Sequence, residues 1–432
     1  MPTTTVARPD VQRDGDTWLL TWLDQGFGIG FDHLETTRSD GLKAEVTVES
    51  NIEGRLAGPA TLNLLSVRSQ SEVAGICADR NGHSRDEWKA VFIQACAIVA
   101  QEYRAPSPTI RMRDFKQSGP IKYIADKLIP KGESTLLYAD GESGKSLLAQ
   151  RVALSYAGGL DLPWGEPIRE QGNVLYLDTE TNSDAVGTRL RRLAIGMGLG
   201  GLDELDHEIF YRGTDNVSHS YLGLLDHEIA DIRAQISRDR IGLVIVDSIS
   251  YAIDGSLVED GPARLATRLL RQMAPATRLV TGHVNADTAK QTHGKGRPFG
   301  SVYFWNGMRS CIEVRSSEER NEALQFGMYH QKFNEGAHHR DLAVRASFAE
   351  ECDGIAFRRT DLEDIPDLVS HTSLSGRLRA ALRAGSQTSD ELGPQVGADP
   401  ATCDRTLRRM PGIVNLNPGR GRGHLALWGL SG

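Results

Sequence analysis

The sequence of 432 residues has few cysteines and no long apolar segment. Its five cysteines are scattered, with no CxxC pair and no zinc-ligand spacing, so we expect neither a disulfide framework nor a structural zinc. Residues 1–10 lack the apolar core of a secretory signal, and no apolar run is long enough to cross a bilayer. We therefore expect a cytoplasmic protein with no membrane partner.

The sequence also lacks an excess of basic residues. Its formal net charge is -8, so the whole molecule is not an electrostatic nucleic-acid binder. The segment from residue 371 onward differs, because it carries eight arginines, no lysine and only four acidic residues. This asymmetry indicates a basic module attached to an acidic body.

The chain is too long for one compact core, and its patterns separate three regions. Residues 1–108 predict a small α+β domain of unknown role, with strands at 42–48 and 61–64 and a helix over 85–103. Residues 111–362 predict an α/β domain, and residues 371–432 predict a small helical module with a hairpin. A Pro-rich stretch at 105–108 is typical of a linker between the first two.

In residues 111–362, short apolar strands alternate with helices. This alternation, with strands that are apolar throughout, predicts a parallel sheet covered by helices on both faces. We expect strands at 135–138, 174–177, 209–211, 243–246 and 278–281, and helices at 145–157, 222–236 and 264–273, with another through 189–193. Four later strands, at 311–314, 324–329, 342–346 and 355–357, are expected to extend the sheet in an antiparallel manner.

A phosphate-binding loop is predicted between the first of these strands and its helix. Glycines let backbone N–H groups turn toward phosphates, and the helix N-terminus adds partial positive charge. Lys145 would reach the β- and γ-phosphates of ATP, and the Ser146 hydroxyl would bind Mg²⁺. The loop, called the P-loop below, consists of Ala139, Asp140, Gly141, Glu142, Ser143, Gly144, Lys145 and Ser146.

A second element follows about a hundred residues later. Four apolar residues, 243–246, end in Asp247, which places this carboxylate at the carboxyl edge of a central strand. Ligands bind at that edge in open α/β sheets, so Asp247 is predicted to hold the water shell of the magnesium ion.

The order of these motifs resembles the RecA superfamily and, more specifically, the RepA-like hexameric replicative helicases of plasmids and phages. The resemblance covers residues 120–335 and includes the strand 174–180 and Thr281-Gly282-His283. It implies a RecA-like core in which Glu180 activates the attacking water, while Asp178 is less suited because it lies within the strand. His283 matches the family's γ-phosphate sensor.

The same resemblance implies a homo-oligomer, expected to be a hexameric ring. Arg309 matches an arginine that reaches the ATP of the neighbouring subunit, with Arg315 as the alternate, and Lys332 matches a second basic residue at that interface. Such a cation stabilises charge on the transferring phosphoryl group.

A loop at residues 285–298 matches the family's mobile loop that faces a central channel. It carries Lys290, Lys295 and Arg297 together with two glycines. A basic, flexible loop suits contact with the backbone of single-stranded DNA, although a plain solvent loop remains an alternative.

The C-terminal residues 371–432 predict a winged helix. Helices are expected at 374–382 and 389–396, followed by a third that Asp399 caps and a Gly/Arg hairpin. Arg405, Arg408 and Arg409 of the third helix would meet duplex DNA, and Arg420 and Arg422 of the hairpin would contact phosphate. A winged helix used for protein contacts is the alternative.

Three functions are compatible with these patterns. The first is an ATP-driven motor that unwinds or moves DNA during replication of a phage or mobile element. The second is a RecA-type recombination or repair ATPase that forms filaments. The third is a DNA-bound regulator in which ATP only switches assembly, and this function would tolerate the loss of Glu180.

Overall fold

The structure is a computed structural model, and it divides into two compact units, residues 1–118 and 119–432. Each unit is considered by itself. A further division of the second unit near residues 362–371 remains a prediction. The described residues are 7–14, 17–36, 41–105, 109, 111–114, 119–141, 143–213, 224–284, 298–317, 323–349, 353–419 and 425–431.

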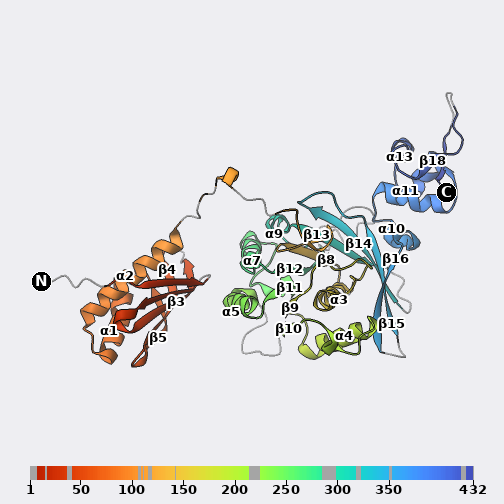
Figure 1. Cartoon of the computed structure of the whole chain (residues 1–432). Helices are drawn as coiled ribbons and strands as arrows, with labels where there is room; N and C mark the ends of the chain where they lie inside the picture. Colours follow the sequence, from red (N-terminus) through yellow and green to blue (C-terminus); the bar gives the residue numbers. More distant parts are fainter. Residues whose placement is uncertain are drawn as a thin grey trace. The chain divides into compact units, whose positions relative to one another are not determined.

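The first unit is an antiparallel sheet with two helices packed against one face (Figure 1). Its five strands follow chain order: β1 (Asp10–Asp14), β2 (Thr17–Trp22), β3 (Phe27–Thr36), β4 (Leu42–Ser50) and β5 (Gly54–Asn63). The helices are α1 (Val67–Asn81) and α2 (Arg85–Arg104), with short 3-10 turns at Leu23–Gln25 and Met112–Asp114.

The α+β character of this unit was predicted, but only two of its strands were. In β3 the buried residues Phe27, Ile29 and Phe31 alternate with glycines and a polar residue on the other face. A glycine on the open face gives a weak strand signal, because glycine is depleted in strands. The predicted helix over 85–103 is confirmed as α2, which begins with a capping box from Ser84 and Glu87.

The second unit is built around a nine-stranded sheet of order β10-β9-β11-β12-β8-β13-β14-β15-β16. The parallel strands are β8 (Ser134–Ala139), β9 (Asn173–Asp178), β10 (Ile209–Arg212), β11 (Ile241–Asp247), β12 (Thr277–His283) and β13 (Ser310–Ser316). The antiparallel strands are β14 (Ala323–Phe333), β15 (Leu342–Ala349) and β16 (Gly354–Thr360). A separate pair, β6 (Tyr123–Ala125) and β7 (Ile129–Pro130), precedes β8.

Helices cover both faces of this sheet, as Figure 1 shows. One face packs against α3 (Lys145–Gly158) and α4 (Ser183–Gly196). The other face packs against α5 (Leu224–Arg238), α6 (Ile249–Ala252), α7 (Asp260–Gln272) and α9 (Val302–Gly307). A 3-10 turn lies at Leu202–Glu204. The α/β architecture predicted from strand and helix alternation is confirmed, and its sheet is mostly parallel, as in a RecA-like core.

One detail of the predicted sheet was wrong. Residues 311–314 were expected to begin the antiparallel part, but β13 pairs in parallel with β8, with Ser310 opposite Thr135. The short helix α9 reverses the chain before β13 and lets it enter beside β8 in the parallel direction. Only β14, β15 and β16 are antiparallel, as the sequence predicts for them.

The C-terminal residues form a small helical cluster with its own apolar core. After a 3-10 turn (Leu362–Asp364) and α10 (Pro366–Val369) come α11 (Leu374–Arg383), α12 (Ser389–Val396) and α13 (Pro400–Leu407). A three-stranded sheet contains β17 (Gln387–Thr388), β18 (Ile413–Asn415) and β19 (Leu427–Leu430). Three helices with a small sheet are the elements of a winged helix, and that identity stays a prediction.

The predicted caps of these helices are confirmed. Thr388 and Glu391 form a capping box at α12, and the Asp399 side chain accepts from the N–H groups of Ala401 and Thr402. The third helix is shorter than expected, because Arg408 and Arg409 follow its last residue. Among the described residues, no helix has the length and apolarity needed to span a membrane.

Candidate nucleotide site

The P-loop connects the carboxyl end of β8 to the first residue of α3. The backbone N–H of Gly141 donates to the side chain of Asp140, and the Ser143 hydroxyl donates to the backbone carbonyl of Asp140, over 2.8 and 2.6 Å. These bonds hold the turn that leads into the helix N-terminus. Lys145 begins the helix and is 5% exposed. Glu142 lies outside the described residues.

Any residue with a Cβ would be strained at Gly144 and would clash with a neighbouring side chain. Its φ is +77°, a left-handed conformation, and a Cβ built there would lie 2.4 Å from the Phe326 ring of β14. Phe326 is fully buried and stacks with Phe357. The antiparallel part of the sheet therefore supports the P-loop from the α3 side.

Asp247 is a buried carboxylate that three hydroxyl groups hold in place. Thr281 and Ser146 donate to its Oδ1 over 2.6 and 3.1 Å, and Tyr176 donates to its Oδ2 over 2.5 Å. Gln150 of α3 in turn donates to the Tyr176 hydroxyl over 3.2 Å. Burial raises the pKa of Asp247, and these hydrogen bonds oppose the rise.

Glu180, His283 and Lys145 meet beside this carboxylate. The Nε2 of His283 is 3.5 Å from a carboxylate oxygen of Glu180, and its Nδ1 is 3.5 Å from the Lys145 ammonium. The His283 ring, with Ser248 and Lys145 as further contributors, lowers the pKa of Glu180 to about 2. Glu180 is therefore ionised at neutral pH, so it is suited to accept a hydrogen bond from water.

These positions follow from the strand order. The parallel strands β8, β9, β11 and β12 are neighbours, so their carboxyl ends lie at one edge of the sheet. Asp178 also lies there, but its oxygens accept from Glu180, Thr181 and Tyr211, which makes it a support for the turn after β9. The predicted residues Lys145, Ser146, Glu180, Asp247 and His283 are thus brought together.

Sequence reasoning missed three residues of the site, Tyr176, Thr281 and Phe326. A tyrosine within the apolar strand β9 was a usable signal, because a buried tyrosine hydroxyl normally finds a partner. Thr281 was noted only as part of a motif. Phe326 gave no local signal, because its contact with the P-loop depends on sheet pairing between distant segments.

Arg309 and Lys332 lie at the opposite edge of the sheet. The N–H of Arg309 bonds to the carbonyl of Ser134, the first residue of β8, whereas the P-loop follows the last residue of that strand. A six-residue strand spans about 20 Å. The Arg309 side chain is near Glu133 and Glu335, at 3.5 and 3.9 Å. It cannot reach the P-loop of its own chain.

Lys332 and Arg315 already have partners within the chain. The Lys332 ammonium donates to the backbone carbonyls of Trp305 and Met308, both over 2.7 Å, and burial lowers its pKa. Arg315 is paired with Glu313 at 2.6 Å and bonds to His371 at 3.3 Å. Of the interface candidates, Arg309 has the most exposed cationic side chain, at 46%.

The predicted DNA-contacting residues divide into two groups. Lys290, Lys295, Arg297, Arg420 and Arg422 lie outside the described residues. Arg405, Arg408 and Arg409 lie at and after the end of α13, and all three are exposed.

A family model matches the part of the chain that holds the P-loop and Asp247. Residues 100–289 match the family model described as an AAA domain. A solved structure of a KaiC-like protein from the hyperthermophilic archaeon Pyrococcus horikoshii OT3 is similar, at 15% identity and a TM-score of 0.37, over 55% of this chain and 99% of that one. No curated protein sequence matches the chain.

The fold is RecA-like, with a mostly parallel sheet covered by helices on both faces, and the site has the groups of a P-loop nucleotide site. The residues also fit Mg-ATP, because the Ser146 hydroxyl and the Asp247 carboxylate are adjacent oxygen ligands beside a helix N-terminus. Bound magnesium would neutralise charge on the β- and γ-phosphates. Lys145 would meet the same phosphates, and Glu180 would orient water toward them.

Proposed function

We propose that the protein is an oligomeric ATP-hydrolysing motor that acts on DNA, of the replicative-helicase type that its core resembles. The observation that carries this proposal is the convergence of Lys145, Asp247, Glu180 and His283 at one edge of the sheet. An ATP switch without turnover has no need for an ionised carboxylate positioned beside the phosphate-binding lysine. The arrangement therefore favours hydrolysis.

The location of Arg309 supports an oligomer. Among the described residues, the side-chain contacts of Lys145, Asp247 and Glu180 are with histidine, hydroxyl groups and one another, and none is with an arginine. A partly exposed arginine at the far edge can complete the site only in a neighbouring copy. We propose a closed ring, expected to be hexameric, in which Arg309 of one subunit stabilises the transferring phosphoryl group of the next.

A row of arginines supports DNA as the substrate of the motor. Arg264, Arg268 and Arg271 are exposed on α7, and with Tyr303 and Asn306 of α9 they line a groove of about 540 Å³. The Arg264 guanidinium lies 4.0 Å from the centroid of the Tyr303 ring. Within the described residues, none of these arginines has an ion-pair partner. Three such cations in one groove suit a phosphate backbone.

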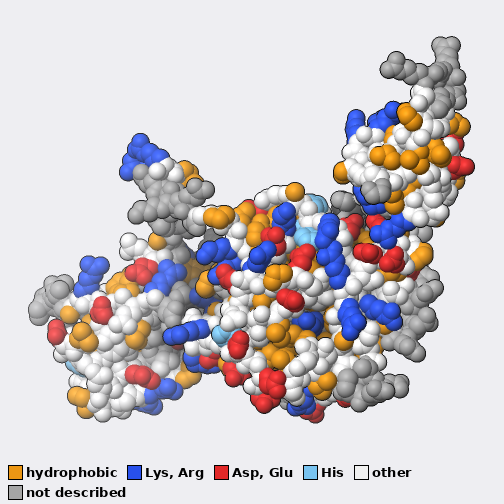
Figure 2. Space-filling model, turned by 45° about the vertical axis from the view of Figure 1, so that its right-hand side comes forward, with side chains coloured by type: hydrophobic (Ala, Val, Ile, Leu, Met, Phe, Trp, Pro, Cys, Tyr) orange, Lys and Arg blue, Asp and Glu red, His pale blue; other side chains and the backbone are white. Residues whose placement is uncertain are grey.

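On the face drawn in Figure 2, acidic and basic side chains are interspersed over the larger unit. The net charge of -8 agrees with this mixture. Contact with DNA would therefore depend on local groups of arginines rather than on a generally basic surface. In the proposal, single-stranded DNA occupies the channel of the ring, and duplex DNA meets the C-terminal helices.

Two assays test the proposal together. ATP hydrolysis is measured with and without single-stranded DNA, and strand displacement is measured on a forked duplex, with Lys145→Ala as the inactive control. We expect DNA to stimulate hydrolysis and the wild type alone to displace a strand. A wild type that hydrolyses ATP but never displaces a strand would contradict the helicase function, and one that forms filaments instead of rings would favour the recombinase.

A further inference from the structure

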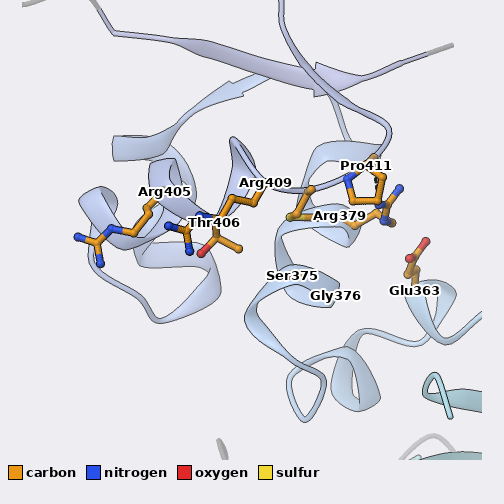
Figure 3. A pocket seen from close by; sticks show the side chains of 9 residues that line it. Glu363, Ser375, Gly376, Arg379, Arg405, Thr406, Arg409 and Pro411 are labelled. Atoms are coloured by element: carbon orange, nitrogen blue, oxygen red, sulfur yellow. Dashed lines mark hydrogen bonds between the residues drawn. The ribbon is translucent and has the colours of Figure 1, made fainter. Parts of the chain in front are cut away.

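A groove between α11 and α13 collects three arginines from different parts of the C-terminal cluster. It has a volume of about 440 Å³ and is lined by Arg379 of α11, Arg405 and Thr406 of α13, and Arg409. Figure 3 shows Arg405 and Arg409 on the α13 side of the groove and Arg379 beside Pro411. Arginines from both helices therefore line the groove.

The charge of this groove is not neutralised within the described structure. Arg405 and Arg409 are exposed and have no acidic partner there. Arg379 donates to the backbone carbonyl of Pro411 over 2.7 Å, which fixes the side chain without cancelling its charge. The acidic lining residue, Glu363, is paired with Arg383 at 2.6 Å.

Arg408 differs from its neighbours, although the sequence suggests the same role for it. Its guanidinium makes two bonds to the Asp404 carboxylate, over 2.8 and 3.3 Å. It also lies 5.7 Å from the centroid of the Trp428 ring of β19. Arg408 thus links α13 to the small sheet, and its charge is already matched by Asp404.

We propose that Arg379, Arg405 and Arg409 form a phosphate-binding site for the backbone of duplex DNA, and that Arg408 does not take part. This inference rests on the proposed function, because it names the surface through which the motor would hold duplex. Guanidinium groups bind phosphate oxygens in a bidentate manner, and three of them line this one groove. The Thr406 hydroxyl already donates to the backbone carbonyl of Thr402 over 2.7 Å, so the arginines carry the binding.

The shape of α13 favours duplex over an acidic protein. Its exposed side carries the small residues Ala401 and Thr402 one turn before Arg405. Small side chains let a helix approach closely, and the major groove of DNA is wide enough to admit a helix. Arginines at the end of such a helix would then contact the flanking phosphates.

The test measures binding of the full chain to a short fluorescein-labelled duplex by fluorescence anisotropy, without nucleotide, over a series of salt concentrations. Arg405→Gln and Arg409→Gln are compared with Arg408→Gln, which removes the same charge from the same segment. Each phosphate contact contributes about 0.9 to the slope of log affinity against log salt. We expect the first two variants each to lower the slope by about one unit, equally for two unrelated duplex sequences.

Arg408→Gln is expected to keep the wild-type slope, since its charge is already neutralised by Asp404. Arg405→Lys should retain most of the slope that Arg405→Gln loses. Equal losses in all three glutamine variants would overturn the inference, because they would indicate a general charge effect. Unchanged slopes in Arg405→Gln and Arg409→Gln would also overturn it.

A competition experiment tests the choice of ligand. If poly-glutamate displaces the labelled duplex as readily as unlabelled duplex does, the site favours an acidic protein partner and the proposal of duplex DNA is overturned. Because binding is measured without nucleotide, the result does not depend on hydrolysis. A chain that shows the expected slopes but no DNA-stimulated ATP hydrolysis would refute the motor and leave this site in place. If DNA stimulates ATP hydrolysis by the wild type but Arg405→Gln and Arg409→Gln keep the wild-type salt slope, only this site is refuted.

Discussion

The two edges of the central sheet differ in how many groups of a nucleotide site each one carries. The carboxyl edge has the P-loop, Asp247, Glu180 and His283 within contact of one another. The amino edge has Arg309 beside Glu133, with no phosphate-binding loop among its described residues. Under the proposed function, one chain binds ATP with its own groups, and the arginine that speeds turnover comes from a neighbouring chain.

The largest effect is expected from the loss of Lys145. Its ammonium is buried at the P-loop, and charge-assisted hydrogen bonds are worth about 1.5–3 kcal/mol each. Lys145→Ala should weaken Mg-ATP binding roughly 100-fold and abolish hydrolysis. The matched control is Lys131→Ala, which removes a lysine just before β8 at the amino edge. If both variants lost Mg-ATP binding to the same extent, the carboxyl edge would contribute no more to nucleotide binding than the amino edge does.

Glu180→Gln should separate binding from turnover. The amide keeps the shape of the side chain but cannot accept and orient water in the same way, so kcat should fall by about 10²–10⁴-fold. Nucleotide affinity should change little, as measured by titration with a fluorescent ATP analogue. Glu208→Gln, an exposed acid just before β10, serves as the control. Full activity in Glu180→Gln would favour an ATP switch.

Arg309→Ala tests the amino edge directly. The variant should bind ATP normally and lose turnover by roughly 10³-fold, because its neighbour's phosphates lack the arginine. Mixing it with Glu180→Gln should restore part of the activity, since mixed rings contain some sites with both groups intact. Lack of any rescue across mixing ratios would show that Arg309 does not act between subunits.

A smaller effect is expected from the hydroxyl that holds Asp247. Tyr176→Phe removes one hydrogen bond to the buried carboxylate, and such a bond contributes about 1 kcal/mol. The magnesium concentration needed for half-maximal ATP binding should rise by about three- to tenfold. Tyr156→Phe removes a hydroxyl from the same core away from Asp247 and should leave the magnesium dependence unchanged. The same shift in both would indicate a general loss of packing.

The sequence predicts the parts of the site that lie on short continuous segments. The P-loop requires one glycine-rich turn before a helix, and Asp247 and Glu180 each follow an apolar strand, so local pattern and strand polarity are enough to place them. The contacts of Tyr176 and Phe326 could not be derived in this way. They depend on β9 lying beside β11 and on β14 returning past the P-loop, which is decided by packing between segments far apart in the chain.

The position of Arg309 at the amino edge also depends on long-range strand pairing that the sequence does not reveal. Arg309 was selected through a family resemblance, but its position depends on the parallel pairing of β13 with β8, which the sequence reading assigned as antiparallel. The expected winged-helix layout likewise assigns Arg408 to DNA contact, together with Arg405 and Arg409 of the third helix. The Asp404 carboxylate is visible one helical turn away in the sequence, and the i, i+4 spacing was a usable signal.

Isothermal titration of the purified wild-type chain with Mg-ATP tests the central claim most directly. The account predicts saturable binding at one site per chain, lost in Lys145→Ala and weakened when magnesium is chelated. A wild-type chain that is folded by circular dichroism and gives no binding heat with Mg-ATP at any accessible concentration would contradict the account.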